Sequence, residues 1–186
     1  MLDIQLSKSI KKRRSIYPKQ FTGEKISKRH ILELLENANT APTHKMTQPW
    51  FFKIFSGKSK LDLVKELIKI QEINSDDVKE KLINKFALTS HVICICMRKS
   101  ENKIIPEWEE VAATAMAVQN LWLSCVNSQN IGGYWSTPKG HEKLNEFLNL
   151  KTNERNLGLF YLGIYNHITT PKKTRKNIIN DVFWYN

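Results

Sequence analysis

Residues 106–133 read PEWEEVAATAMAVQNLWLSCVNSQNIGG and form the most distinctive stretch of the chain. The stretch opens with Pro106, which favours a helix start, and we expect the helix to stop at Gly132-Gly133. A helix that is apolar nearly all round is buried in a core or in a subunit interface. The side chains that leave it almost no polar face are Val111, Ala112, Ala115, Met116, Val118, Leu121, Trp122, Leu123, Cys125 and Val126.

Short apolar segments predict the strands of a central sheet. HVICICM at 91–97 is apolar on both faces, as a central strand should be, and NLGLFYLGIY at 156–165 predicts a second central strand. WFFKIF at 50–55 predicts another, ended by Ser56-Gly57. Two or three strands interleaved with helices, but not in strict β-α-β order, indicate an α+β fold. A doubly wound α/β fold is the weaker alternative, because the chain has no GxGxxG motif and only 7 glycines.

Helical patterns fill much of the remaining chain. We expect a helix over 4–14 and a second one capped by Ser27, in SKRHILELLENAN. One or two amphipathic helices should cover 59–87, with a break near 74–77, and a short helix should cover 141–148. YWSTP, from Tyr134, predicts a corner, and the last residues predict an extended tail that packs on another surface.

Composition predicts one domain over residues 1–186. Three cysteines make a disulfide framework unexpected, and Cys94 and Cys96 read as core thiols rather than metal ligands. We therefore expect no metal site. The N-terminal pattern is not that of a signal peptide, and no stretch has membrane-span length, so we expect a cytoplasmic protein that does not bind membranes.

The formal charge of +11 comes from 29 Lys and Arg against 18 Asp and Glu. Scattered lysines usually mark a solvated surface, whereas nucleic-acid binding requires a basic patch. No helix-turn-helix or aromatic-basic sheet motif accompanies the charge, so we expect no nucleic-acid partner. Two basic clusters stand out, KKRR at 11–14 and PKKTRK at 171–176. Either both are surface, or both converge on one anionic ligand.

Common catalytic motifs are absent from the sequence. It has no Walker A loop, no GxSxG elbow and no HExxH pair, which points to a cofactor that carries the chemistry. Arg13, Arg14 and Ser15 could bind a phosphate through guanidinium and hydroxyl groups, and Lys173 and Arg175 could close on it from the far end. A run of basic residues on a helix is nevertheless more often a solvated face.

Four blocks of sequence together resemble the flavin-dependent nitroreductase family, and its small, short-chain members most of all. They are Arg13-Arg14-Ser15, APTHKMTQPWFF at 41–52, GGYWSTP at 132–138 and GLFYLG at 158–163, in the family's order and rough spacing. The resemblance implies an α+β homodimer with a mostly antiparallel sheet flanked by helices and with swapped C-terminal tails. It also implies two FMN molecules in the subunit interface.

The resemblance also implies roles for individual residues. Arg13, Arg14 and Ser15 match the family's FMN phosphate site, to which Arg175, with Lys173, adds late basic charge. Two further groups match positions beside the flavin ring. They are His44 and Gln48 of the loop, which reach the flavin of the partner subunit, and Trp135, Ser136 and Thr137 of the turn.

Two departures from the family pattern bear on activity. The turn reads Trp135-Ser136-Thr137-Pro138, where relatives carry an arginine after the tryptophan and a glycine at the end, and Met46 replaces an asparagine of many larger members. The first departure removes a fixed positive charge and several donors.

The resemblance implies an FMN-dependent enzyme that uses NADH or NADPH to reduce nitroaromatics, quinones or similar acceptors by ping-pong hydride transfer. No side chain need act as nucleophile or general base, because the flavin carries the chemistry. Two alternatives stay open: a flavin-binding protein of this fold with impaired catalysis, and a basic nucleic-acid-binding protein.

Overall fold

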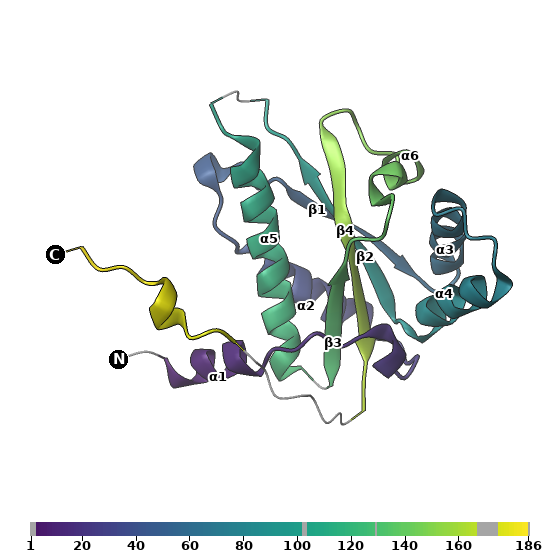
Figure 1. The fold of residues 1–186 in the computed structure, drawn as a ribbon, viewed down its shortest axis with the longest axis horizontal. Helices are drawn as coiled ribbons and strands as arrows, with labels where there is room; N and C mark the ends of the chain where they lie inside the picture. Colours follow the sequence, from purple (N-terminus) through teal and green to yellow (C-terminus); the bar gives the residue numbers. More distant parts are fainter. Residues whose placement is uncertain (1–2, 102–103, 129, 167–174, 186) are drawn as a thin grey trace.

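A four-stranded antiparallel sheet forms the centre of the molecule, in the order β1-β2-β4-β3, in a computed structural model that describes residues 3–101, 104–128, 130–166 and 175–185 (Figure 1). Each neighbouring pair of strands is antiparallel. The α+β prediction is therefore confirmed, with one strand more than the sequence suggested. The strands are β1 (Trp50–Ser56), β2 (His91–Arg98), β3 (Ile131–Ser136) and β4 (Glu154–Ile164).

Helices cover both faces of this sheet, so the fold has three layers (Figure 1). One apolar core joins one face of the sheet to α2 (Lys28–Asn39) and α5 (Glu107–Ser124). A second core joins the other face to α3 (Ser59–Ile70), α4 (Asp76–Leu88) and α6 (Leu144–Phe147). β2 lies between these cores, and its residues 92–97 are all buried, which confirms its prediction as a central strand.

Most of the predicted helix boundaries agree with the structure. The Ser27 hydroxyl accepts a hydrogen bond from the His30 backbone N–H at 3.2 Å, so Ser27 caps α2 as expected. The expected break near 74–77 separates α3 from α4. Helix α1 (Ile4–Lys12) is shorter than predicted, because Arg13 has extended backbone angles and ends it.

Gly132 and Gly133 were predicted to stop the long helix, and this prediction is wrong. Helix α5 already ends at Ser124, a short 3-10 turn (Cys125–Asn127) follows, and both glycines lie inside β3. A Cβ on Gly133 would lie 2.2 Å from the Phe160 ring, so glycine is needed for close packing in the strand. The corner predicted from Tyr134 likewise begins in β3.

Helix α5 buries only one of its two apolar faces against the sheet. Ala113, Ala117 and Leu121 are at most 2% exposed, whereas Trp108 is 68% exposed and Met116 40%. The outer face is thus apolar but open in the single chain. Such an exposed apolar face is typical of an interaction surface.

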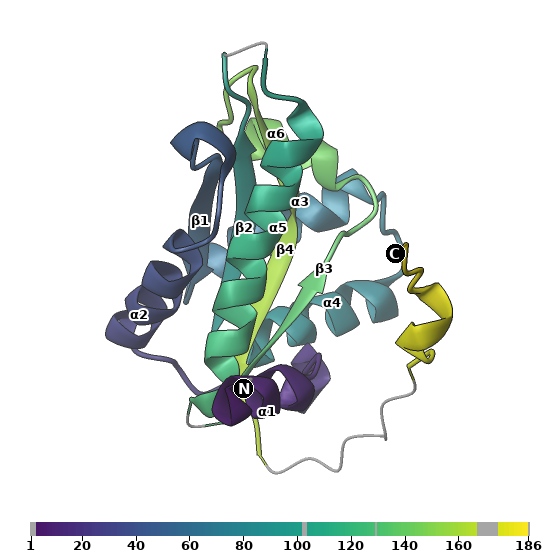
Figure 2. The ribbon, with the colours of Figure 1, turned by 90° about the vertical axis from the view of Figure 1, so that its left-hand side faces the viewer.

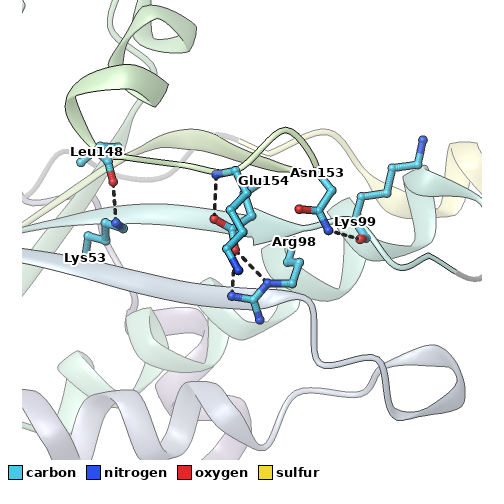
Figure 3. A network of polar contacts seen from close by, with 7 residues as sticks. Lys53, Arg98, Lys99, Leu148, Asn153 and Glu154 are labelled. Carbon is cyan, nitrogen blue, oxygen red and sulfur yellow. Dashed lines mark hydrogen bonds and ion pairs between the residues drawn. The ribbon is translucent and has the colours of Figure 1, made fainter.

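A polar network fixes the strand ends near α6 (Figure 3). The buried Glu154 carboxylate accepts hydrogen bonds from Arg98 Nε at 2.8 Å and from the Lys151 backbone N–H at 3.1 Å. Lys53 Nζ donates to the Leu148 carbonyl oxygen at 2.5 Å. These contacts hold the β1, β2 and β4 ends and the α6 segment together.

The C-terminal segment 175–185 contributes nothing to either core. It includes one 3-10 turn, η5 (Ile178–Asp181), and each of its residues is exposed. Trp184 is 85% exposed and Tyr185 94%. Figure 2 shows this segment, in yellow, lying apart from the helices and the sheet.

Candidate functional site

Arg13, Arg14 and Ser15 follow directly after α1, as a short connection to the sheet edge. The Ile16 backbone N–H donates to the Gly133 carbonyl oxygen at 3.1 Å, which fixes this connection beside β3. Arg14 Nη1 donates to the carbonyl oxygens of Lys11 at 2.8 Å and Lys12 at 3.1 Å. Arg14 Nη1 thus caps the C-terminal end of α1.

The two guanidinium groups are held in a partly buried, positively charged cluster. Arg13 lies over the Trp122 ring at 4.4 Å from the centroid, and Trp122 Nε1 donates to the Arg14 carbonyl oxygen at 3.2 Å. Burial, and then the charges of Arg175 and Arg14, lower the pKa of the Arg13 guanidinium. The Arg175 charge therefore acts on this cluster from the far end of the chain.

Two nitrogen atoms of this cluster lack partners. Arg13 Nη1 and Arg14 Nε are buried, and neither has a hydrogen-bond partner within the described ranges. Buried donors without partners are costly, and guanidinium donors form strong, charge-assisted hydrogen bonds with oxyanions. A hollow of about 340 Å³ adjoins Arg14; its lining includes Lys12, Trp122, Ser128, Gly132 and Gly133.

His44 and Gln48 lie in a different part of the subunit, at the start of α5. His44 opens a 3-10 turn, η2 (His44–Met46), and its Nδ1 is 2.5 Å from Glu109 Oε2. The Gln48 backbone N–H donates to Thr43 Oγ1 at 3.2 Å, and the Gln48 side chain is exposed. This loop therefore presents two exposed polar side chains at one end of the molecule.

A single chain does not bring the loop and the arginine cluster together. The loop contacts α5 at Glu109 and the cluster contacts it at Trp122. Since each helical residue rises 1.5 Å, these positions are about 20 Å apart along α5. Lys173, predicted to assist Arg175, lies outside the described residues.

Trp135 and Ser136 end β3 and Thr137 follows it, on the same edge of the sheet as the Arg14 connection. Trp135 Nε1 donates to the Leu157 carbonyl oxygen at 3.2 Å, and Thr137 is exposed. Gly158, opposite in β4, has φ +124°, and a Cβ there would lie 2.7 Å from the Ser136 oxygen. The close approach of this glycine shapes the turn after Ser136.

Sequence reasoning missed a second hollow beside the same edge strand. It measures about 550 Å³ and is lined by Tyr17, Pro18, Lys19, Lys81, Asn84, Lys85, Leu88 and Tyr134. Lys85 Nζ lies 3.9 Å from the centroid of the Tyr161 ring, and burial lowers the pKa of its ammonium group to about 8. Arg14 and Ile16 line the first hollow and Tyr17 and Pro18 the second, so one short segment joins both.

Comparison with known proteins assigns the chain to a family. The family model described as Nitroreductase family matches residues 10–164. The chain belongs to this family. A Bacillus subtilis protein named "Putative NAD(P)H nitroreductase YfhC" is 26% identical to it over 181 residues, covering 94% of this chain and 90% of that protein.

Solved structures share the fold of this nitroreductase-family chain. A nitroreductase-like family protein from Bacillus cereus has a TM-score of 0.83 at 24% identity, covering 100% of this chain and 98% of that one. A Desulfovibrio desulfuricans protein, solved in complex with FMN, has a TM-score of 0.76 at 16% identity, with 99% and 98% covered. The expected family and fold are thus confirmed.

The arginine cluster fits the phosphate of a flavin nucleotide, because it gathers guanidinium charges beside a hollow and has unpartnered donors. Elsewhere in the described part of this nitroreductase-family chain, no group of three or more His, Cys, Asp or Glu side chains could hold a metal ion. None of the described helices is long and apolar enough to cross a membrane.

Proposed function

We propose that the protein is an FMN-dependent oxidoreductase that takes electrons from NADH or NADPH and reduces nitroaromatics, quinones or similar electron-poor acceptors. The observation that carries this proposal is the pair of buried, unpartnered nitrogens on Arg13 and Arg14, at the edge of a nitroreductase-family sheet. The FMN in the Desulfovibrio structure and the NAD(P)H in the name of the Bacillus subtilis relative support it.

Arg13, Arg14 and Ser15 would bind the FMN phosphate, with Arg175 adding charge. The flavin ring would lie along the β3 edge that the Arg14 connection joins. Trp135, Ser136 and Thr137 continue the same edge and would line the end of the ring site. When bound, the flavin supplies the hydride chemistry.

We further propose that residues 1–186 form a single domain and one half of a homodimer. The loop and the arginine cluster contact α5 at positions about 20 Å apart along the helix, so His44 and Gln48 would serve the flavin of the partner subunit. The open outer face of α5 and the exposed tail offer apolar surface for that contact. In such a dimer the tails would exchange between subunits.

The visible absorbance spectrum of the purified protein tests the proposal. We expect a yellow protein whose flavin is bleached by NADH or NADPH without oxygen and reoxidised by a quinone or a nitroaromatic. Replacing Arg14 with Ala should release the flavin, whereas replacing the surface residue Arg29, which pairs with Glu33, should not. A colourless protein that cannot be loaded with FMN would contradict the proposal.

The same experiment separates the two alternatives. The turn after Trp135 lacks the arginine of relatives, so a protein with impaired catalysis would hold flavin but would not be reduced by NAD(P)H. The charge of +11 is the one observation in favour of nucleic-acid binding. A salt-sensitive gel shift by flavin-free protein would favour that function.

A further inference from the structure

His44 and Glu109 form a close polar pair between the loop and α5. His44 Nδ1 lies 2.5 Å from Glu109 Oε2, although the residues are 65 positions apart in the chain. The His44 side chain is 47% exposed and the Glu109 side chain 25%. Because a carboxylate accepts at Nδ1, the proton is held on that nitrogen, and exchange of protons with the surroundings is confined to Nε2.

Glu109 differs from the other glutamates at the start of α5 in its partner. Glu107 pairs with Arg155 at 2.5 Å and Lys99 at 3.3 Å, and Glu110 accepts from the Ser100 backbone N–H at about 3 Å. Glu107 thus holds the start of α5 to two positively charged side chains, and Glu110 holds it to a backbone N–H. Glu109 alone among the three contacts an imidazole, whose two ring nitrogens can each carry a proton.

The loop that carries His44 has a strained backbone. Lys45, Met46 and Gln48 have φ values of 50°, 55° and 43°, in the left-handed region that favours glycine. Each such residue costs on the order of 1 kcal/mol. Strain of this kind persists where the surroundings hold it, and it is frequent at functional sites. The Glu109 contact is one of the interactions that hold this loop.

We propose that His44 is the proton donor to the acceptor, and that Glu109 is its positioning residue. This inference rests on the proposed function, including the service of His44 to the partner's site. It goes beyond that function because it assigns a side chain of the protein as the general acid of the reaction.

The proton balance is simple for a quinone. Conversion to a hydroquinone takes up two electrons and two protons; hydride transfer supplies both electrons and one hydrogen nucleus. The second proton comes from the imidazolium form of His44, as the Nε2–H bond breaks and an O–H bond forms on the quinone oxygen. The Nδ1 proton of His44 stays on that nitrogen, hydrogen-bonded to Glu109, and water returns a proton to Nε2. Acid catalysis of this type contributes about 10²-fold or more to a rate.

Replacing His44 with Asn separates the acid role from the structural one. The Asn amide can still donate to Glu109 from near the Nδ1 position, but it has no counterpart of Nε2. In one stopped-flow experiment, we expect reoxidation of the bound flavin by 1,4-benzoquinone to slow about 100-fold more than its reduction by NADPH does. His141→Asn is the matched control, since His141 Nδ1 also faces a glutamate, Glu142, at 3.3 Å. Unchanged reoxidation in His44→Asn would overturn the acid role.

The positioning role has a readout that does not depend on activity. In flavin-free protein, ¹⁵N NMR of the His44 ring should show the neutral tautomer with its proton on Nδ1. Glu109→Gln introduces an amide that can donate to Nδ1 and should move the proton to Nε2, whereas Glu109→Asp should preserve the wild-type tautomer. A wild-type ring with its neutral proton on Nε2 would overturn the positioning role.

Failure of this inference is distinguishable from failure of the proposed function. A wild-type protein without flavin, or with flavin that NAD(P)H does not reduce, would contradict the proposed function and remove the acid role with it. Flavin reduction in both His44→Asn and wild type, followed by equal reoxidation rates, would contradict the acid role alone.

Discussion

At the residue scale, Lys85 is the side chain with the clearest pH-dependent consequence. Burial lowers the pKa of its ammonium group to about 8, against about 10.4 in an unfolded chain. Between these values the unfolded chain binds more protons than the folded one, so the stability contribution of Lys85 rises with pH. Below about pH 8 Lys85 is charged in both states, and burial of that charge then destabilises the folded state by its full amount.

Replacing Lys85 with Met should therefore stabilise the flavin-free protein at neutral pH, by roughly 1–3 kcal/mol. The gain should shrink as pH rises from about 8 to about 10, because the wild-type lysine then loses its charge in the folded state. Urea unfolding at several pH values measures this. Lys81→Met is the control, since Lys81 forms an exposed pair with Asp77. A gain in stability that is the same at each pH would contradict its attribution to the buried charge of Lys85.

At the element scale, helix α5 has one face that packs against the sheet and an opposite face that is open to a partner. Ala117 is fully buried against the sheet, whereas Ala115, on the opposite side of the helix, is half-buried in the single chain. Small residues on the inner face allow the helix to approach the strands closely. The two faces should therefore respond differently to the same substitution.

Replacing Ala117 with Leu should lower the free energy of unfolding by about 1–3 kcal/mol, because the packed inner face has no room for the larger side chain. Replacing Ala115 with Leu should leave subunit stability nearly unchanged and weaken association instead. Urea unfolding measures the first effect and sedimentation velocity the second. Equal destabilisation by both substitutions would contradict the division into two faces.

Local sequence patterns predicted the elements whose residue types follow from helix capping or from burial on both faces of a strand. The Ser27 cap and the buried β2 are examples. Strand β3 was missed because its glycines resemble a helix stop, whereas side chains from distant segments explain them: Ile16 packs on Gly132, and Phe160 packs on Gly133. The hollow around Lys85 and the His44 contact with Glu109 join distant segments, so no local pattern could reveal them.

At the scale of the whole molecule, the exposed tail has a role that the single subunit does not explain. Deleting residues 175–186 should leave the unfolding of the subunit almost unchanged, because each described residue in this segment is exposed. The deletion should nevertheless weaken dimer formation and flavin retention, which sedimentation velocity and absorbance would measure. Arg175→Ala is the control that removes charge near Arg13 but keeps the apolar tail. A truncated protein that dimerises and keeps its flavin would contradict this role.

The distance between the arginine cluster and the His44 loop has a genetic consequence. In a dimer whose sites combine one chain's cluster with the other chain's loop, Arg14→Ala and His44→Asn chains should complement each other. Each mixed dimer would contain one site with both intact parts and one site with neither. By two-fold symmetry and random pairing, about one quarter of all sites would be restored when the two defective chains are co-expressed. Flavin reoxidation by a quinone, absent or slow in either pure variant, would return in the mixture.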